Sequence, residues 1–245
     1  MQVYTEQHII QGTDLDCTEK ISYGNALCAF INCFTNFNGH INKGNINIRR
    51  DYNAFWIVSK YVMYFHRRPV WNEHVTNYFN VYGRQNLKVL SNFYCKKDDE
   101  LLFEGICEAC VLNFGTQKFC ALDEIGYPHI DENSNNNNLE TLKFTKFVPD
   151  NGNEDFAYDK TIRFGDTDMS HHTNNIAYIT FLLNAMPSSF YSQHELKRIE
   201  IHYLAQSYEG NRLDIYVRDD KEGNILYSAC DTEGRTIVKM MAAYA

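Results

Sequence analysis

Residues 60–65 read Lys-Tyr-Val-Met-Tyr-Phe and residues 198–203 read Arg-Ile-Glu-Ile-His-Tyr, and the two stretches align without a gap. A helix-like segment precedes each of them, and an Asp-x-Asp motif stands before each helix-like segment, at residues 14–16 and 166–168. This repeated order predicts an internal duplication, with one amphipathic helix and a meander of about four strands in each half. A helix packed on one face of a sheet is a two-layer α+β unit. The duplication therefore decides the fold class.

The hydrophobic periods of the rest of the sequence predict the remaining helices and strands. Residues 19–38 and 174–186 carry apolar residues at roughly the 3.6-residue period of a helix. Residues 38–54 are rich in Asn and Gly and predict a loop. Strands are predicted from residue 55 up to the break before Pro69, and at 75–82, 87–95, 101–114, 156–164, 196–203, 212–217, 225–230 and 235–243.

A polar tract separates the two halves. Residues 135–138 are four consecutive Asn among acidic and polar neighbours, which is the composition of a linker. We therefore expect an N-terminal half at residues 1–127, a linker at 128–150 and a C-terminal half at 151–245.

Composition narrows the class of protein. The 245 residues are 44% hydrophobic and 22% charged, which excludes a wholly disordered chain. The net charge of −8 makes the chain a poor bulk binder of nucleic acid or of an anionic membrane. No apolar run reaches the ~18 residues of a membrane helix, and the first residues lack the pattern of a secretory signal. We expect a cytoplasmic protein that binds no nucleic acid and does not span a membrane.

The cysteines give no sign of a metal or redox centre. Eight Cys are scattered through apolar stretches, as is typical of reduced, buried thiols. The close pair Cys107-x-x-Cys110 has no second pair to complete a zinc site. We expect no metal and no cofactor.

The densest polar cluster occupies residues 163–175, between a predicted strand and a predicted helix. Asp168, Ser170 and His172 fall in it at every second position. A carboxylate and an imidazole in one turn can activate a water molecule, and the free N–H groups of a helix N-terminus can stabilise an oxyanion. The alternative is that Asp168, Ser170 or Thr173 merely caps the helix.

Residues 166–178 carry the pattern D-x-D-x-S-x-H-x-N-N-x-x-Y, which resembles the D-x-D-x-N-x-H-V-N-N-x-x-Y signature of acyl-ACP thioesterases. Residues 56–58 with 67–69, and residues 203–207, resemble further parts of that family, so the resemblance extends over essentially the whole chain. It implies a tandem (double) hot-dog fold, in which each half is an antiparallel sheet wrapped around a long central helix. It also implies hydrolysis of fatty acyl-ACP to free fatty acid and ACP, a reaction of fatty acid biosynthesis.

By position, the resemblance assigns the catalytic group to Asp168, Ser170, His172 and Gln206. Ser170 stands where the family has Asn, and Gln206 stands where it has Glu. The hydroxyl of Ser170 can still hold a water, whereas the neutral amide of Gln206 cannot act as a base and can only orient a water or an imidazole. Ser207 stands where some members have Cys, so a covalent cysteine mechanism is not expected.

The start of the predicted second helix and the internal duplication suggest where the substrate binds. Backbone N–H groups at Thr173, Asn174 and Asn175 are expected to receive the thioester oxygen. In the first half, the position that matches His172 is Lys20, so we expect one active site, in the second half. The first half would supply the acyl pocket from the apolar helix residues Leu27, Phe30, Ile31 and Phe34, for which the alternative is plain core packing.

The implied partner is acyl carrier protein with its fatty acyl thioester. The carrier is acidic, so docking needs local positive charge, for which the candidate pairs are Arg49-Arg50, Arg67-Arg68, Lys96-Lys97 and Lys197-Arg198. The alternatives are an acyl-CoA thioesterase, a dehydratase of 3-hydroxyacyl substrates, and a non-catalytic hot-dog protein that binds acyl thioesters. A serine hydrolase is disfavoured because the chain has no Gly-x-Ser-x-Gly. We expect a monomer or a homodimer.

Overall fold

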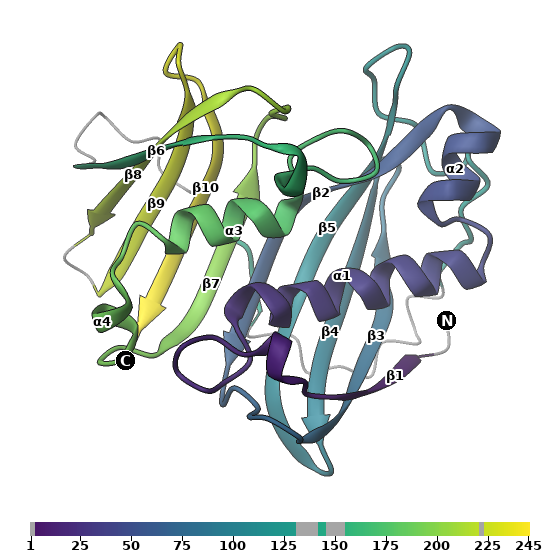
Figure 1. The fold of residues 1–245 in the computed structure, drawn as a ribbon. Coiled ribbons are helices and arrows are strands. Elements are labelled where there is room, and N and C mark those ends of the chain that lie inside the picture. Colours follow the sequence, from purple (N-terminus) through teal and green to yellow (C-terminus); the bar gives the residue numbers. More distant parts are fainter. Residues whose placement is uncertain (1–2, 131–141, 146–154, 221–222) are drawn as a thin grey trace. The chain divides into compact units, whose positions relative to one another are not determined.

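The structure is a computed structural model that describes residues 3–130, 142–145, 155–220 and 223–245 (Figure 1). The chain divides into two compact units, Met1–Tyr61 with His66–Lys143 and Val62–Phe65 with Phe144–Ala245. The Asn-rich tract at 135–138 lies outside the described residues, and the predicted boundaries of the halves and their linker stay a prediction.

The first unit is an antiparallel sheet crossed by a long helix. Its strands run in the order β1-β3-β4-β5-β2, and α1 (Tyr23–His40) lies across them (Figure 1). The bounds are β1 Tyr4–Ile9, β2 Ala54–Phe65, β3 His74–Arg84, β4 Lys88–Lys97 and β5 Glu100–Asn113. The core is aromatic, because Phe30 of α1 is fully buried against the rings of Tyr61, Phe79 and Phe93. Burying aromatic side chains of this size is a main source of the unit's stability.

Part of the predicted loop at residues 38–54 is wrong. Residues Asn45–Tyr52 form a short helix, α2, which begins after Gly44. Ile48 anchors it with a fully buried side chain, and Asn53 ends it in the left-handed conformation, where its N–H donates to the carbonyl of Arg49. Asn is one of the few residues that adopt this conformation readily. The Asn- and Gly-rich composition concealed the helix because one buried anchor gives no periodic signal. The strand β1 was also not predicted.

The second unit repeats this architecture. Its strands run in the order β7-β10-β9-β8-β6, and α3 (Asn175–Leu183) lies across them (Figure 1). The bounds are β6 Asp155–Thr161, β7 Leu196–Tyr203, β8 Arg212–Asp219, β9 Asn224–Asp231 and β10 Thr236–Tyr244, with a short helix α4 at Ser188–Tyr191. Each unit is therefore a helix on an antiparallel sheet, as the duplication predicts.

Tyrosine hydroxyls from three other elements of the second unit donate hydrogen bonds to α3. Tyr203 of β7 donates to the carbonyl of Asn175 at 3.1 Å, near the start of the helix. Tyr158 of β6 and Tyr191 of α4 each donate at 2.6 Å to carbonyls near its end, those of Phe181 and Leu183. The helix itself, NIAYITFLL, carries no charge and contains several β-branched and aromatic residues. Its stability therefore depends on tertiary contacts more than on helix propensity.

The duplication extends to individual hydrogen bonds before each helix. A short 3-10 helix, Gly12–Asp14 or Phe164–Asp166, precedes the loop in both units. In the first, the N–H of Gln11 donates to Asp14 Oδ2 at 2.8 Å, and in the second the N–H of Arg163 donates to Asp166 Oδ2, also at 2.8 Å. The first Asp of each Asp-x-Asp motif is thus a structural residue that closes the same turn.

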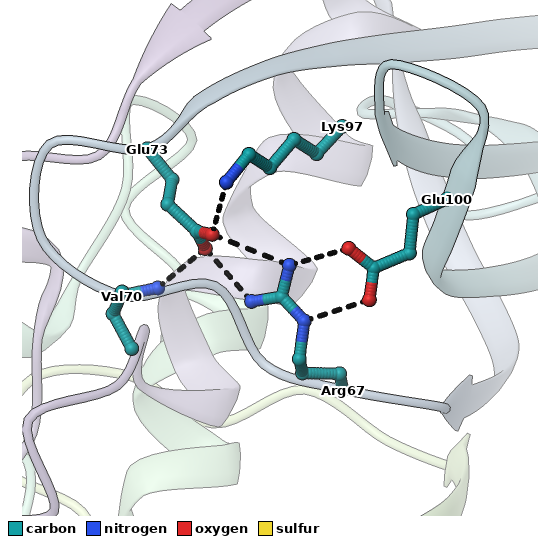
Figure 2. A network of polar contacts seen from close by, with 5 residues as sticks. All are labelled: Arg67, Val70, Glu73, Lys97 and Glu100. Carbon is teal, nitrogen blue, oxygen red and sulfur yellow. Dashed lines mark hydrogen bonds and ion pairs between the residues drawn. The ribbon is translucent and has the colours of Figure 1, made fainter.

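An ion-pair network joins the segment after β2 to the β4–β5 hairpin (Figure 2). Arg67 donates to Glu73 Oε2 from Nη1 at 2.8 Å and to both carboxylate oxygens of Glu100. Glu73 also accepts from Lys97 Nζ at 2.8 Å and from the Val70 N–H at 2.9 Å. Burial alone would raise the pKa of Glu73, but these donors more than offset it and hold that pKa at about 2. Glu73 therefore stays ionised in the folded unit.

Replacing Glu73 by Gln is expected to lower the free energy of unfolding by about 1–3 kcal/mol at neutral pH, because Arg67 and Lys97 lose their shared partner. A carboxylate with a lowered pKa stabilises the fold above its unfolded pKa of about 4.5 and loses this effect as the pH falls toward 2. The difference between wild type and Glu73→Gln should therefore shrink with acidification. Urea unfolding at neutral pH and near pH 3 measures it, with Glu233→Gln in an exposed turn as control. A difference that does not depend on pH would contradict this account.

Candidate active site

The loop before α3 brings the second Asp of the motif beside His172. The N–H of Asp168 donates to the carbonyl of His172 at 2.9 Å, and the N–H of His171 donates to the carbonyl of Asp168 at 3.0 Å. His171 has a φ of 62°, in the left-handed region, and this lets the chain reverse within four residues. The backbone therefore holds Asp168 and His172 at the two ends of one tight turn.

The segment after β7 packs against this turn. The N–H of Thr173 donates to the carbonyl of Ser207 at 2.9 Å, and His172 and Tyr208 form an isolated antiparallel bridge. The Tyr208 ring lies edge-on to the His172 ring, with centroids 5.1 Å apart, and its hydroxyl donates to Gln206 Oε1 at 3.3 Å. The structure thus brings Asp168, Ser170 and His172 into one turn of the second unit and packs against it the segment that carries Gln206, the fourth predicted catalytic residue.

A buried hydroxyl network lies behind the cluster. The Ser207 hydroxyl is 2.7 Å from both Thr173 Oγ1 and the Tyr178 hydroxyl, and the Ser207 N–H donates to Tyr178 at 3.1 Å. Burial raises the pKa of Tyr178, so this hydroxyl keeps its proton. This network was not predicted. The one available signal was Tyr178, five residues after the predicted cap Thr173, on the buried face of the helix.

The carboxylate of Asp168 is open to solvent. The residue is exposed, and its Oδ1 accepts the N–H of Ser170 at 2.7 Å. Across the described ranges, this carboxylate makes no ion pair with a Lys or an Arg. Since a carboxylate has about four lone-pair positions, Asp168 retains the capacity to accept a hydrogen bond from water. Ser170 contributes its backbone to this geometry, and its half-buried side chain lies in the same turn.

The environment of His172 favours its neutral form. Burial lowers the pKa of His172 below its ordinary value of 6.5, and the neighbouring His171 lowers it further, while the Asp168 carboxylate opposes both effects. A neutral imidazole has one nitrogen that can accept a proton. At neutral pH, His172 can therefore serve as a proton acceptor.

The start of α3 leaves one predicted amide available. The helix is capped by Asn174, whose side chain accepts the N–H of Ile176 at 2.8 Å. The N–H of Thr173 is bonded to Ser207, and that of Asn174 donates to the carbonyl of Asp166 at 2.8 Å. Within the described residues, the N–H of Asn175 has no protein partner. Because it belongs to the first turn, it points out of the helix where a partial positive charge is concentrated.

In the first unit, the four predicted pocket residues have different environments. Leu27, Phe30 and Phe34 are buried in the core, and Ile31 is partly exposed. A cavity of about 130 Å³ lies along another face of α1 and β1, and its walls are mostly polar. Its lining includes Glu6, His8, Asp14, Asn25, Cys28 and Asn32. The acyl-binding role of Leu27, Phe30, Ile31 and Phe34 stays a prediction.

No three or more His, Cys, Asp or Glu side chains among the described residues are placed to hold a metal ion. None of the described helices has both the length and the hydropathy that a membrane span requires.

Comparison with solved structures identifies the fold. The chain is similar to an acyl-ACP thioesterase from Bacteroides thetaiotaomicron, with a TM-score of 0.85 and 17% identity over 99% of this chain and 98% of that chain. It is similar to the 12:0-ACP thioesterase from Umbellularia californica, with a TM-score of 0.84 and 16% identity over 99% and 97% of the chains. The predicted α+β fold, a double hot-dog, is confirmed.

The sequence comparisons match the second half of the chain to a known family. Residues 150–244 match the family model of the acyl-ACP thioesterase C-terminal domain. A stretch of 74 residues is 28% identical to the chloroplastic oleoyl-acyl carrier protein thioesterase 2 of Arabidopsis thaliana, and covers 30% of this chain and 20% of the plant protein. The match therefore spans about a fifth of the relative's length. The matched region contains the whole cluster around Asp168, so the C-terminal half of the chain is similar to the C-terminal domain of acyl-ACP thioesterases.

Proposed function

We propose that this protein hydrolyses fatty acyl thioesters of acyl carrier protein and releases the free fatty acid and the carrier thiol. The observation that supports the proposal most is the turn that places Asp168 and His172 before α3, packed against the segment that carries Gln206. The turn lies within the region that matches the thioesterase family model. A cytoplasmic role in fatty acid biosynthesis is part of this proposal.

The proposed reaction begins with a water molecule held by the Asp168 carboxylate. Its oxygen attacks the thioester carbonyl carbon, and its proton passes to the carboxylate or to the neutral imidazole of His172. Ser170 and Gln206 orient this water, because neither side chain is basic at neutral pH. The tetrahedral intermediate collapses, the C–S bond breaks, and the departing thiolate takes up the proton. The products are a carboxylic acid and a thiol, so atoms and charge balance.

The oxyanion of the intermediate binds at the start of α3. The N–H of Asn175 donates to it, in the positive field of the helix N-terminus. A donor of this kind contributes about 3–4 kcal/mol to the stability of the transition state in known cases. The hydroxyl network of Thr173, Tyr178 and Ser207 fixes this amide relative to Asp168, since it ties the helix to the segment that carries Gln206.

Replacing Asp168 by Asn, or His172 by Ala, is expected to lower kcat for acyl-ACP hydrolysis by about 10²–10⁴-fold, because each variant removes a group that moves a proton. A thiol-release assay on acyl-ACP measures this. The matched control is His171→Asn, which changes the adjacent imidazole and keeps a residue type that adopts the left-handed φ of 62°. Full activity in both Asp168→Asn and His172→Ala would contradict the assignment.

The protonation of His172 gives a second test. Its pKa, followed by NMR of the ring protons, is expected below 6.5 because burial disfavours the charged imidazole. In Asp168→Asn it should fall further, since the carboxylate that opposes the burial effect is gone. The rate of hydrolysis by the wild type should decline at acid pH as this imidazole takes up a proton. A pKa above 6.5 that does not respond to Asp168→Asn would contradict the proposed arrangement.

Ion pairs within the protein reduce the number of cations that could contact the carrier. In each candidate pair at least one cation is already engaged: Arg50 with Asp51, Arg67 with Glu73 and Glu100, Arg68 with Asp16, Lys97 with Glu73, Lys197 with Glu195, and Arg198 with Glu200. Arg68 is also almost fully buried, with 3% of its side chain exposed. Arg50 keeps 67% of its side chain exposed, and Lys97 and Lys197 keep 40% each, so these three are the better candidates for contact with an acidic carrier.

If the carrier is recognised by charge, kcat/KM should be higher for acyl-ACP than for the same acyl group on CoA. The advantage should shrink as NaCl rises from about 50 to about 300 mM, because salt screens contacts between exposed charges. Parallel thiol-release assays with the two carriers measure both effects. Equal kcat/KM values at every salt concentration would favour the alternative of an acyl-CoA thioesterase.

A second candidate, a non-catalytic protein that binds acyl thioesters, rests on one observation. Ser170 and Gln206 replace two residues of the family signature, and neither can act as a base. Thermal stabilisation by acyl-ACP without thiol release would establish this alternative.

A further inference from the structure

The first unit holds a geometric counterpart of the candidate site. The N–H of Asp16 donates to the carbonyl of Lys20 at 2.9 Å, as that of Asp168 does to His172. The N–H of Thr18 donates to Asp16 Oδ1 at 2.9 Å, the same contact that Ser170 makes with Asp168. The loop before α1 is therefore built like the loop before α3.

The segment that packs against this loop also corresponds. The N–H of Ile21 donates to the carbonyl of Pro69 at 2.8 Å, and Lys20 forms an isolated antiparallel bridge with Val70. In the second unit, Ser207 and Tyr208 occupy these two positions. The residue before Pro69 is Arg68, so Arg68 is the counterpart of Gln206.

The side chain of Arg68 is almost fully buried and contacts several groups of the loop before α1. Its guanidinium forms an ion pair with Asp16, donates to the carbonyl of Ile21 at 2.9 Å and donates to Thr18 Oγ1 at 2.7 Å. It also lies 4.1 Å from the ring centroid of Tyr23, a cation–π contact. The guanidinium is almost fully buried and the carboxylate of Asp16 is 27% exposed, so water screens this charge-assisted contact only weakly. The carboxylate of Asp16 is therefore committed to Arg68.

The two loops differ in whether their carboxylate is paired with a cation from the packed segment. Asp16 is neutralised by a cation, whereas Asp168 accepts only the Ser170 N–H among the described residues. We propose that the first unit carries a disabled counterpart of the active site, closed by Arg68, and that a neutral side chain at position 206 keeps Asp168 open to water. This inference rests on the proposed function for its catalytic part. It gives Gln206 a role that needs no basicity: it occupies the position without pairing with Asp168.

The test introduces into the second unit the arginine–aspartate ion pair that Arg68 and Asp16 form in the first. Gln206→Arg is expected to lower kcat/KM for acyl-ACP by about 100-fold or more, because the new guanidinium captures the carboxylate that holds the water. It should also raise Tm by about 2–4 °C through the new ion pair. Gln206→Met, of similar length and without charge, should show no gain in Tm and a smaller loss of rate.

A stability cycle separates an ion pair from simple obstruction. The gain in Tm of Gln206→Arg should vanish when Asp168 is also replaced by Asn. In the first unit, the double variant Arg68→Gln with Asp16→Asn should lose less Tm than the sum of the two single losses. Arg68→Gln should leave kcat unchanged, measured well below its lowered Tm. These melting data do not require hydrolysis, so they test the two arginine–aspartate ion pairs even if the proposed function fails.

Three results would overturn the inference. They are an unchanged rate in Gln206→Arg, a gain in Tm that survives Asp168→Asn, and an equal loss of rate in Gln206→Arg and Gln206→Met. If Gln206→Arg does not fold, Gln206→Lys takes its place in the same cycle, and a lack of coupling between that lysine and Asp168 counts against the proposal.

Discussion

The hydrogen bond from the Thr173 amide to the Ser207 carbonyl is the constraint on which the candidate site depends. It joins the residue before the α3 cap to the segment that leaves β7. Through it, His172 meets Tyr208, 36 residues later in the sequence, and the segment that carries Gln206 packs against the turn that carries Asp168. The first unit uses the same bond, from Ile21 to Pro69. A shared backbone frame thus carries different side chains in the two units, and the side chains decide which unit has a usable carboxylate.

Much of the fold could be predicted because it follows from periodicity. The strand at 196–203 agrees with β7 at both ends, and the duplicated order of elements located both central helices. The helix α2 was missed because it relies on one buried side chain, Ile48, and on the cap at Asn53. Neither leaves a repeating pattern. Such elements are fixed by packing against distant residues, which a local window cannot report.

The candidate site could be predicted in part for a related reason. The loop residues Asp168 and His172 lie close together in sequence, so their spacing alone places them in one turn. The contacts that fix the turn come from far away: Tyr208 packs on His172, and Ser207 joins Thr173 to Tyr178. The role of Arg68 was also hidden. In the sequence it is one of two adjacent cations, and only the structure shows that it is buried on Asp16 while Arg67 pairs with surface acids.

The tyrosine hydroxyls around α3 have a consequence for where this activity can exist. Nine residues without a charged side chain, several of them β-branched or aromatic, would not form a helix in water as an excised peptide. The Asn175 amide that we propose as the oxyanion donor, and the turn that carries Asp168, would then have no defined orientation. Reactivity is thus a property of the assembled C-terminal half, gained and lost together with its tertiary structure, and a short segment grafted onto another scaffold would not carry it along.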